Sequence, residues 1–307
     1  MRKTLLLLGL FIPSFICISQ EYEWWNKNNN WDGVTHWTKY IIVSPEFMGP
    51  NALPVPDIKD GKLFNKTEFE LDYDYHYSKG DITQNVFSKI NIPFKSDNIG
   101  VSFSMVPVEY YDFDSITRDL RHSREFDGKG YSVGDVFIGT YIQLLSNKRI
   151  LPDVLLTINI KTASGSNFSS ARFTDAPAYF FDMSFGKEYY IKNTKLKSIK
   201  PYIMSGFYCW QTNDEAHFQD DAIIYGAGLN LNFNKFIIQN SFGGYIGYLN
   251  NGDKPCVYRA ILKTNFNSAT NYNIMYQQGL NDFYYKTFRI GLNINLDKIV
   301  TKKTVTI

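Results

Sequence analysis

Polar and apolar residues alternate without a break between positions 68 and 76 of this chain. The odd positions there are apolar or aromatic, and the even positions form a polar face of Glu68, Glu70, Asp72, Asp74 and His76. A β-strand points successive side chains to opposite faces, so the pattern predicts a strand with one acidic and one apolar face. The whole alternating stretch, residues 63–78, is longer than the usual soluble strand of about 5–6 residues.

The same alternation recurs along most of the chain. It predicts twelve strands, at residues 63–78, 82–95, 99–111, 133–145, 154–163, 178–190, 199–211, 222–233, 236–249, 256–266, 271–279 and 283–297. Each is near or above the roughly 9–11 residues that a tilted strand needs to cross a bilayer. The sequence therefore predicts an all-β fold, an antiparallel transmembrane β-barrel over residues 62–297. The alternative is a secreted β-sandwich, which would have to pack its apolar faces against each other.

The connections between the predicted strands support a barrel. Outer-membrane barrels have long loops on the outer side and short turns on the periplasmic side. If the first strand runs outward, the three longest connections, 112–132, 164–177 and 212–221, all fall outside. Asn234-Lys235 then forms a two-residue inner turn, and the even strand count returns the chain to the periplasm.

Residues 1–19 have the features of a secretory signal peptide. Arg2 and Lys3 precede an apolar core, and the small residue Ser19 marks the expected cleavage site. Ile16 is too bulky for a lipoprotein signal at Cys17, and the apolar run is short for a membrane anchor, which needs about 20 residues. Export and the barrel pattern together predict the outer membrane, with the lipid bilayer and the barrel-insertion machinery as partners.

Residues 20–61 precede the first strand, and their prolines and glycines predict irregular structure. They hold four of the five tryptophans of the chain, Trp24, Trp25, Trp31 and Trp37. Two interpretations stay open: a plug that folds into the lumen or across the periplasmic mouth, and a periplasmic strap under the barrel rim. Residues 298–307 are expected to form a short periplasmic tail. Because the chain continues past Asp297, the terminal aromatic residue that insertion machinery reads is missing or internal.

Composition removes some alternatives. Without Arg2 and Lys3 the 32 basic residues fall to 30, which equals the 30 acidic residues, so the mature chain is about neutral. Nucleic-acid binding requires a basic surface and is not expected. Aromatic residues make up 17% of the chain, as the two interfacial girdles of a barrel require. The mature chain keeps Cys209 and Cys256, which either stay unpaired or join through the loops.

Residues 130–190 contain a run that resembles a known family. Gly134-Asp135-Val136-Phe137-Ile138-Gly139-Thr140 is followed by Pro152-Asp153, a strand to Lys161, Ser164-Gly165 and then Arg172-Phe173-Thr174-Asp175-Ala176-Pro177. In this order they resemble outer-membrane proteins of the phenol meta-pathway transporter type. The resemblance implies an outer-membrane barrel that takes up a solute, and it implies no catalytic residues.

The acidic face of residues 68–76 is the sharpest polar cluster. Alternate residues on one strand face lie about 7 Å apart, so these carboxylates need counter-charges. The candidate pore-lining cations are Lys161, Arg259, Lys263 and Arg289, with Lys89 as a further lumen-side cation. Arg289 is well placed because the last strand must close against the first. The cluster either orients a solute in the lumen or forms charge pairs that fill it, and the second interpretation is favoured.

Two outer loops are rich in charged residues. The loop 112–132 could fold inward as a constriction, but a solvated surface is the default interpretation. The loop 212–221 holds Asp214, Glu215, His217, Asp220 and Asp221, which could bind Ca²⁺ through oxygen ligands. Their spacing matches no defined motif, so a solvated loop is again the default and no metal site is assigned.

An enzyme is the rival class. Some outer-membrane barrels are lipases, but the chain has no Gly-x-Ser-x-Gly element, and no pair of carboxylates stands out for acid–base work. The sequence therefore predicts a monomeric barrel without a cofactor that gives a small solute passive or gated passage through a narrow charged lumen. The solute is not identified. The alternative is a structural or surface-interaction barrel without transport.

Overall fold

The computed structural model describes residues 22–94 and 98–304, apart from the side chains of residues 301–304. The expected signal peptide lies outside the described residues. Within them, the elements are α1 (Glu23–Asn28), the 3-10 helix η1 (Trp37–Tyr40), β1 (Glu68–Ser78), β2 (Asp81–Pro93), β3 (Ile99–Phe113), α2 (Ser115–Leu120), β4 (Lys129–Ser132), β5 (Phe137–Leu145), β6 (Asp153–Lys161), η2 (Phe168–Ser170), β7 (Ala178–Gly186), β8 (Tyr189–Tyr190), β9 (Leu196–Gln211), β10 (Gln219–Phe233), β11 (Phe236–Ile246), β12 (Cys256–Thr264), β13 (Thr270–Asn281), β14 (Lys286–Asn295) and α3 (Leu296–Thr304). None of the helices in these ranges is long and apolar enough to span a bilayer.

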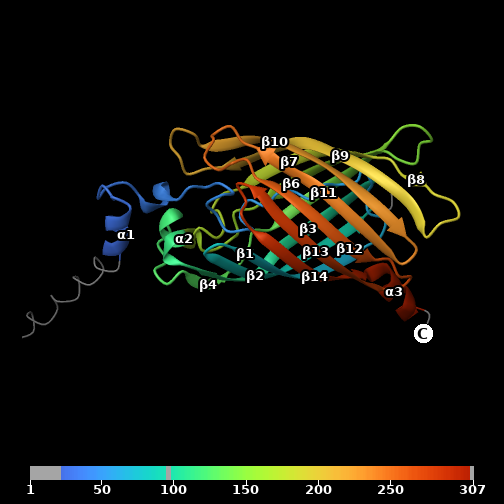
Figure 1. The fold of residues 1–307 in the computed structure, drawn as a ribbon, viewed down its shortest axis with the longest axis horizontal. Helices are drawn as coiled ribbons and strands as arrows, with labels where there is room; N and C mark the ends of the chain where they lie inside the picture. Colours follow the sequence, from blue (N-terminus) through green and yellow to red (C-terminus); the bar gives the residue numbers. More distant parts are fainter. Residues whose placement is uncertain (1–21, 95–97, 305–307) are drawn as a thin grey trace, which may run out of the picture.

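The strands form a closed antiparallel barrel, as the sequence predicts (Figure 1). β14 pairs with β1, placing Asp74 opposite Arg289, and β9 pairs with β10, which closes the ring. Within the described residues the ring contains twelve strands, because β4 and β8 are short additions that pair with β3 and β9. Long connections gather at one end, beyond which α1 and α2 lie; we call it the long-loop end. β1 starts and α3 lies at the opposite, short-turn end.

The two faces of the strands follow the alternation read from the sequence. In β6, Ile158 and Ile160 are 44% and 51% exposed, whereas Asn159 between them and Thr157 and Lys161 on either side are buried. In β14, Phe288 and Ile290 point outward in the same way. An apolar belt of this size on a closed sheet fits contact with lipid, since soluble proteins rarely expose contiguous apolar patches larger than a few hundred Å².

Most predicted strand ends differ from the observed ones by a few residues, and three of these differences have a clear cause. Residues 63–67 are not in β1, because the chain turns into the lumen and the Leu63 amide donates to the Gln143 side chain. The predicted strand 133–145 begins only at Phe137, because Asp135 turns inward to pair with Lys161 at 2.8 Å. The expected tail after Asp297 begins with α3.

The two cysteines are unpaired. Cys209 and Cys256 are both free and buried, so a disulfide through the loops is excluded in this structure.

Candidate functional site

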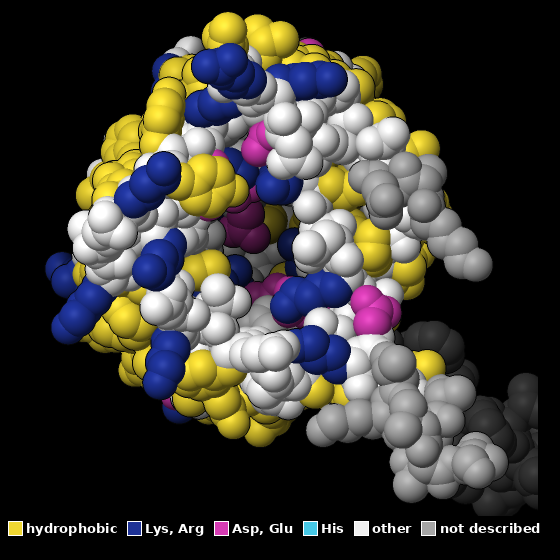
Figure 2. All heavy atoms as spheres, turned by 90° about the vertical axis from the view of Figure 1, so that its right-hand side faces the viewer, with side chains coloured by type: hydrophobic (Ala, Val, Ile, Leu, Met, Phe, Trp, Pro, Cys, Tyr) yellow, Lys and Arg dark blue, Asp and Glu magenta, His cyan; other side chains and the backbone are white. Residues whose placement is uncertain are grey.

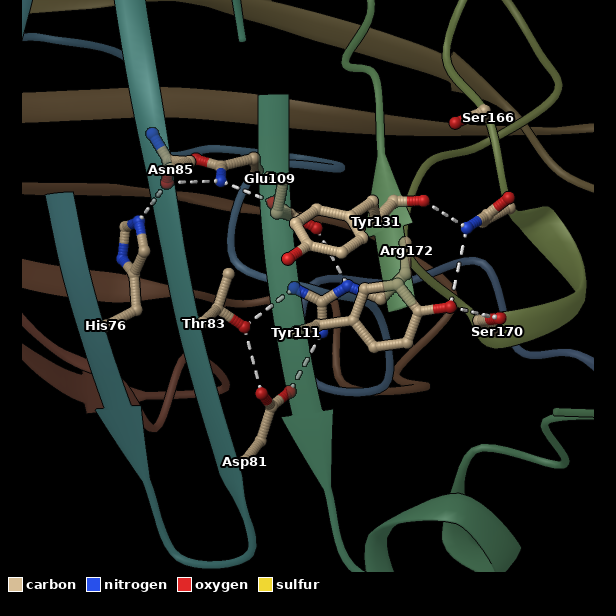
Figure 3. A network of polar contacts seen from close by, with 12 residues as sticks. His76, Asp81, Thr83, Asn85, Glu109, Tyr111, Tyr131, Ser166, Ser170 and Arg172 are labelled. Atoms are coloured by element: carbon tan, nitrogen blue, oxygen red, sulfur yellow. Dashed lines mark hydrogen bonds and ion pairs between the residues drawn. The ribbon is translucent and has the colours of Figure 1, made fainter. Parts of the chain in front are cut away.

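Arg172 closes the long-loop end of the barrel (Figure 3). The guanidinium is fully buried, and its Nε donates to Glu109 Oε1 at 2.8 Å. Its two Nη atoms donate to Asp81 Oδ2 at 3.0 Å and to Thr83 Oγ1 at 2.8 Å. The loop 162–177 is therefore folded into the mouth and fixed to β2 and β3 by charge-assisted hydrogen bonds.

Asp81 also holds two other loops. Arg121, from the loop after α2, donates to Asp81 Oδ2 at 2.7 Å, and the Tyr285 hydroxyl donates to the same oxygen at 2.6 Å. Burial raises the pKa of Tyr285, which keeps the phenol protonated as a donor. One carboxylate at the start of β2 thus joins three loops. The default interpretation of loop 112–132 as a solvated surface is wrong for Arg118 and Arg121, whose side chains are buried.

The N-terminal segment, residues 22–67, enters the barrel at this same end. Trp25 is buried, and its Nε1 donates to the His122 carbonyl at 2.8 Å. Gly49 then passes directly over Arg172, since a Cβ built on Gly49 would lie 2.7 Å from Arg172 Cζ, and its amide donates to the Ala171 carbonyl. Only a residue without a side chain fits this approach.

Residues 43–64, which we call the lumen segment, continue through the barrel. Val43, Leu53 and Val55 pack in one hydrophobic cluster with wall residues that include Tyr208, Trp210 and Tyr245. Asn51 donates to Glu109 and Asn85 at 2.7 and 2.9 Å. The segment leaves at the short-turn end, where β1 begins, so it occupies the lumen along its length.

Ion pairs attach the lumen segment to the wall. Lys59 Nζ lies 2.6 Å from Asp182 Oδ2 on β7. Asp60 pairs with Lys200 on β9 at 3.2 Å. The alternation of polar and apolar residues could not predict these contacts, because the lumen segment contains no strand.

The predicted acidic face points into the lumen, and part of it is neutralised. Arg289 binds Asp74 through two hydrogen bonds of 2.6 and 2.8 Å, and it lies 3.1 Å from Asp72. The expected pairing between the first and last strands is present. His76 is buried, with its ring nitrogens 2.8 Å from Thr287 Oγ1 and from Asn85 Oδ1.

The lumen keeps a hollow, which we call the vestibule, that extends from the short-turn end to His76 and Phe173 near the long-loop closure. It contains adjoining cavities of about 270 and 530 Å³, which share lining residues such as Asp57, Lys89 and Arg289. Figure 2 shows the opening at this end, with basic side chains around and acidic side chains within it. Glu68, Glu70 and Lys263 line the larger cavity.

Two vestibule lysines are not engaged in close ion pairs. Within the described part of the chain, no ion pair of 4.0 Å or less includes Lys89 or Lys263. Arg259 instead donates to the carbonyls of Val55 and Pro56 and lies 3.5 Å from Asp57. The Asp57 side chain itself is 72% exposed to the vestibule. The vestibule thus presents a carboxylate among cations.

Apolar side chains also line the vestibule. The smaller cavity is bordered by aromatic and sulfur-containing side chains, namely Phe64, Phe87, Phe137, Tyr141, Phe180 and Met275. The Arg289 guanidinium lies 4.8 Å from the centre of the Phe87 ring, so charged and aromatic surfaces meet within the cavity.

Two sets of predicted site residues lie elsewhere than expected. Lys161 is fully buried against Asp135 and Thr174, so it does not line the vestibule. The alternation of the strand predicts that Lys161 points inward, but it does not show that Asp135 and Thr174 separate it from the lumen. Trp24, Trp25, Trp31 and Trp37 lie at the long-loop end, not in the lumen or at the mouth where β1 begins (Figure 1). Asp57 and Arg172 were missed, because both belong to irregular segments.

Among the described residues, no group of three or more histidine, cysteine, aspartate or glutamate side chains gathers as a metal cluster.

Comparison of the sequence with known families and with curated proteins finds no match. Solved structures with a similar barrel do exist. An outer-membrane channel from Pseudomonas putida F1 is 10% identical, with 78% of this chain and 98% of that chain covered and a TM-score of 0.51. A KdgM porin is 10% identical over 73% of this chain and 98% of that one, with a TM-score of 0.45. The transport unit of the autotransporter AIDA-I from Escherichia coli is 8% identical over 83% and 99%, with a TM-score of 0.47. The first of these confirms the fold, and identities this low show nothing further.

Proposed function

We propose that this chain is an outer-membrane barrel that gives a small solute gated passage through a narrow charged lumen, with the lumen segment as the gate. The observation that carries the proposal is the asymmetry of the lumen. A vestibule is open at the short-turn end, while the long-loop end is closed by side chains and by a non-covalently held segment.

The outer surface and the fold support this location and role. The apolar belt on the outward face suits a bilayer, and the barrel resembles an outer-membrane channel from another bacterium. We propose that the barrel is monomeric, that insertion machinery places it in the membrane, and that it has no catalytic activity. A purely structural barrel would be expected to fill its lumen, whereas here the vestibule keeps two cavities.

The lining suggests the kind of solute. Aromatic rings and the cations Lys89, Arg259 and Arg289 together border the smaller cavity. A solute with an apolar body and a negatively charged group would find partners for both parts. The cavity volume of about 270 Å³ limits such a solute to a small molecule.

A disulfide lock tests the gate. A Cβ built on Gly226 of β10 would lie 2.8 Å from Ile58 Cγ1 of the lumen segment, close enough for a cysteine at each position to be bridged. The double variant Ile58→Cys/Gly226→Cys should therefore form a bond that holds the segment against the wall. Single-channel currents of residues 20–307 in a planar bilayer would be recorded before and after reduction, with Ile58→Cys alone as the matched control.

The outcomes are distinct. Channel openings that are abolished by oxidation of the double variant and restored by reduction would support the gate. Equal currents in both redox states, with the bond verified, would show that the segment does not gate. Absence of current in every form, with insertion verified by heat-modifiable mobility, would remove the passage itself.

A further inference from the structure

Two aspartates meet at the long-loop end, outside the vestibule. Asp220 is the second residue of β10, and Asp253 lies in the connection between β11 and β12; both are 0% exposed. Asp220 Oδ1 accepts from the Tyr248 amide at 3.2 Å, and Asp253 Oδ2 accepts from the Asn250 amide at 2.9 Å. The two carboxyl groups therefore accept from backbone amides of the same short loop, two residues apart.

The second oxygen of each carboxyl group has no partner. Asp220 Oδ2 and Asp253 Oδ1 are buried and receive no hydrogen bond from any residue that the structure describes. In residues 22–94 and 98–304, neither aspartate forms an ion pair of 4.0 Å or less. Two adjacent carboxylates cannot stay charged and buried without compensation, so either a cation or a shared proton must neutralise them.

The surrounding loop favours a cation, because it offers further oxygen atoms. Asn251 Oδ1, two residues before Asp253, is a third buried oxygen without a hydrogen-bond partner. A proton shared between the two carboxyl groups would leave that amide oxygen unsatisfied.

We propose that Asp220 and Asp253 bind a divalent cation of the calcium class, completed by oxygen atoms of the loop 247–255 and by water. Ca²⁺ takes about 6–8 oxygen ligands in flexible geometry, so two carboxylates with amide, carbonyl and water oxygens form an ordinary ligand set. A site with only two charged ligands suits weak binding, with a dissociation constant on the order of 10⁻⁴–10⁻³ M.

The site would stabilise the loop that holds the N-terminal segment. The Ser44 hydroxyl donates to the Asn251 carbonyl at 2.9 Å, and the Glu46 amide donates to the Gly252 carbonyl at 3.2 Å. A cation bound at Asp253 would therefore hold this loop, and with it the start of the lumen segment. The cation site itself does not depend on whether the segment gates transport.

The test uses the full mature chain in a non-ionic detergent, stripped with a chelator and then freed of it. Calcium binding is measured by titration calorimetry, and the thermal unfolding midpoint is measured with Ca²⁺ and with excess chelator. Asp253→Asn removes one ligand charge with little change in shape. Asp221→Asn is the matched control, because Asp221 is adjacent to Asp220 in sequence and its carboxylate instead accepts from Gln219.

The wild type should show saturable binding and a Ca²⁺-dependent rise of several degrees in the midpoint. Both should be lost in Asp253→Asn and kept in Asp221→Asn. A wild type that neither binds nor is stabilised by Ca²⁺ would overturn the proposal and indicate a shared proton. Loss of the effect in both variants would also overturn it, since binding would then reflect acidic loops in general.

Discussion

Arg172 offers the sharpest test of how the long-loop end is closed. Its guanidinium is fully buried and neutralises Glu109 and Asp81, which are also buried. Replacing it by glutamine keeps some hydrogen-bonding capacity but removes the charge. Breaking a buried ion pair by removing one partner typically destabilises a protein by about 3–5 kcal/mol.

The lower end of that range applies here. Asp81 retains Arg121 and Tyr285 as donors in Arg172→Gln, and Glu109 retains the Asn51 amide, so the full penalty is not reached. We expect a loss of about 3 kcal/mol in the docking of loop 162–177, which corresponds to roughly a 100-fold shift in the docked-to-undocked ratio.

Two measurements check this expectation. Single-channel recording should show a higher open probability, and urea unfolding in lipid vesicles should show a lower free energy of unfolding. Lys129→Gln is the control at the same end of the barrel, because Lys129 pairs with Asp112 at 3.2 Å while both side chains are largely exposed. An exposed pair of this kind contributes about 0–1 kcal/mol. If Arg172→Gln resembled Lys129→Gln in both measurements, the assignment of Arg172 as the closing residue would be wrong.

Three further outcomes are expected. Arg289→Gln leaves Asp72 and Asp74 without their counter-ion, so the free energy of unfolding in urea should fall by about 3 kcal/mol; an unchanged value would contradict the pairing. Lys89→Gln removes a vestibule cation, so the reversal potential in a KCl gradient should move toward cation preference, and an unaltered potential would exclude Lys89 from the pathway. Burial lowers the pKa of His122 below 6.5. The stability that the neutral imidazole contributes is therefore present above that pH and is lost as the pH falls through the folded-state pKa. Protease cleavage within residues 22–49 should increase on acidification in the wild type and not in His122→Asn.

The barrel could be predicted from the sequence because residues on the two faces of each membrane strand differ in polarity and alternate along the chain. In β6 and β14 the outward residues are apolar and the inward ones, apart from Leu155, are polar or small, which fixes the strand and its register against neighbours. The pairing of Arg289 with Asp74 followed from closure of the last strand on the first. Strand ends were predicted less accurately, because they depend on contacts between residues far apart in sequence. Asp135, for example, lies outside the strand because its side chain pairs with Lys161.

The closure of the long-loop end could not be read in this way. Loop residues have no fixed period, so nothing in the sequence shows that Arg172 turns inward while Lys129 stays in solvent. The prediction that the tryptophans form the plug was wrong for the same reason. Trp25 contacts His122 outside the barrel, whereas the lumen is entered by smaller or charged residues such as Lys59.

A signal for an occupied lumen was nevertheless present in the wall. Alternation places Asp182 and Lys200 on inward faces, yet their direct neighbours across the strands, Gly206 opposite Asp182 and Asn230 opposite Lys200, carry no compensating charge. Buried charges require partners, so inward charges without cross-strand partners imply a charged object inside the barrel. Lys59 of the lumen segment is the partner of Asp182, and Asp60 adds to Asp153 of β6 as a second acidic partner of Lys200. The same complementarity holds the segment by a few ion pairs and not by a continuous sheet, which is the arrangement that a removable gate needs.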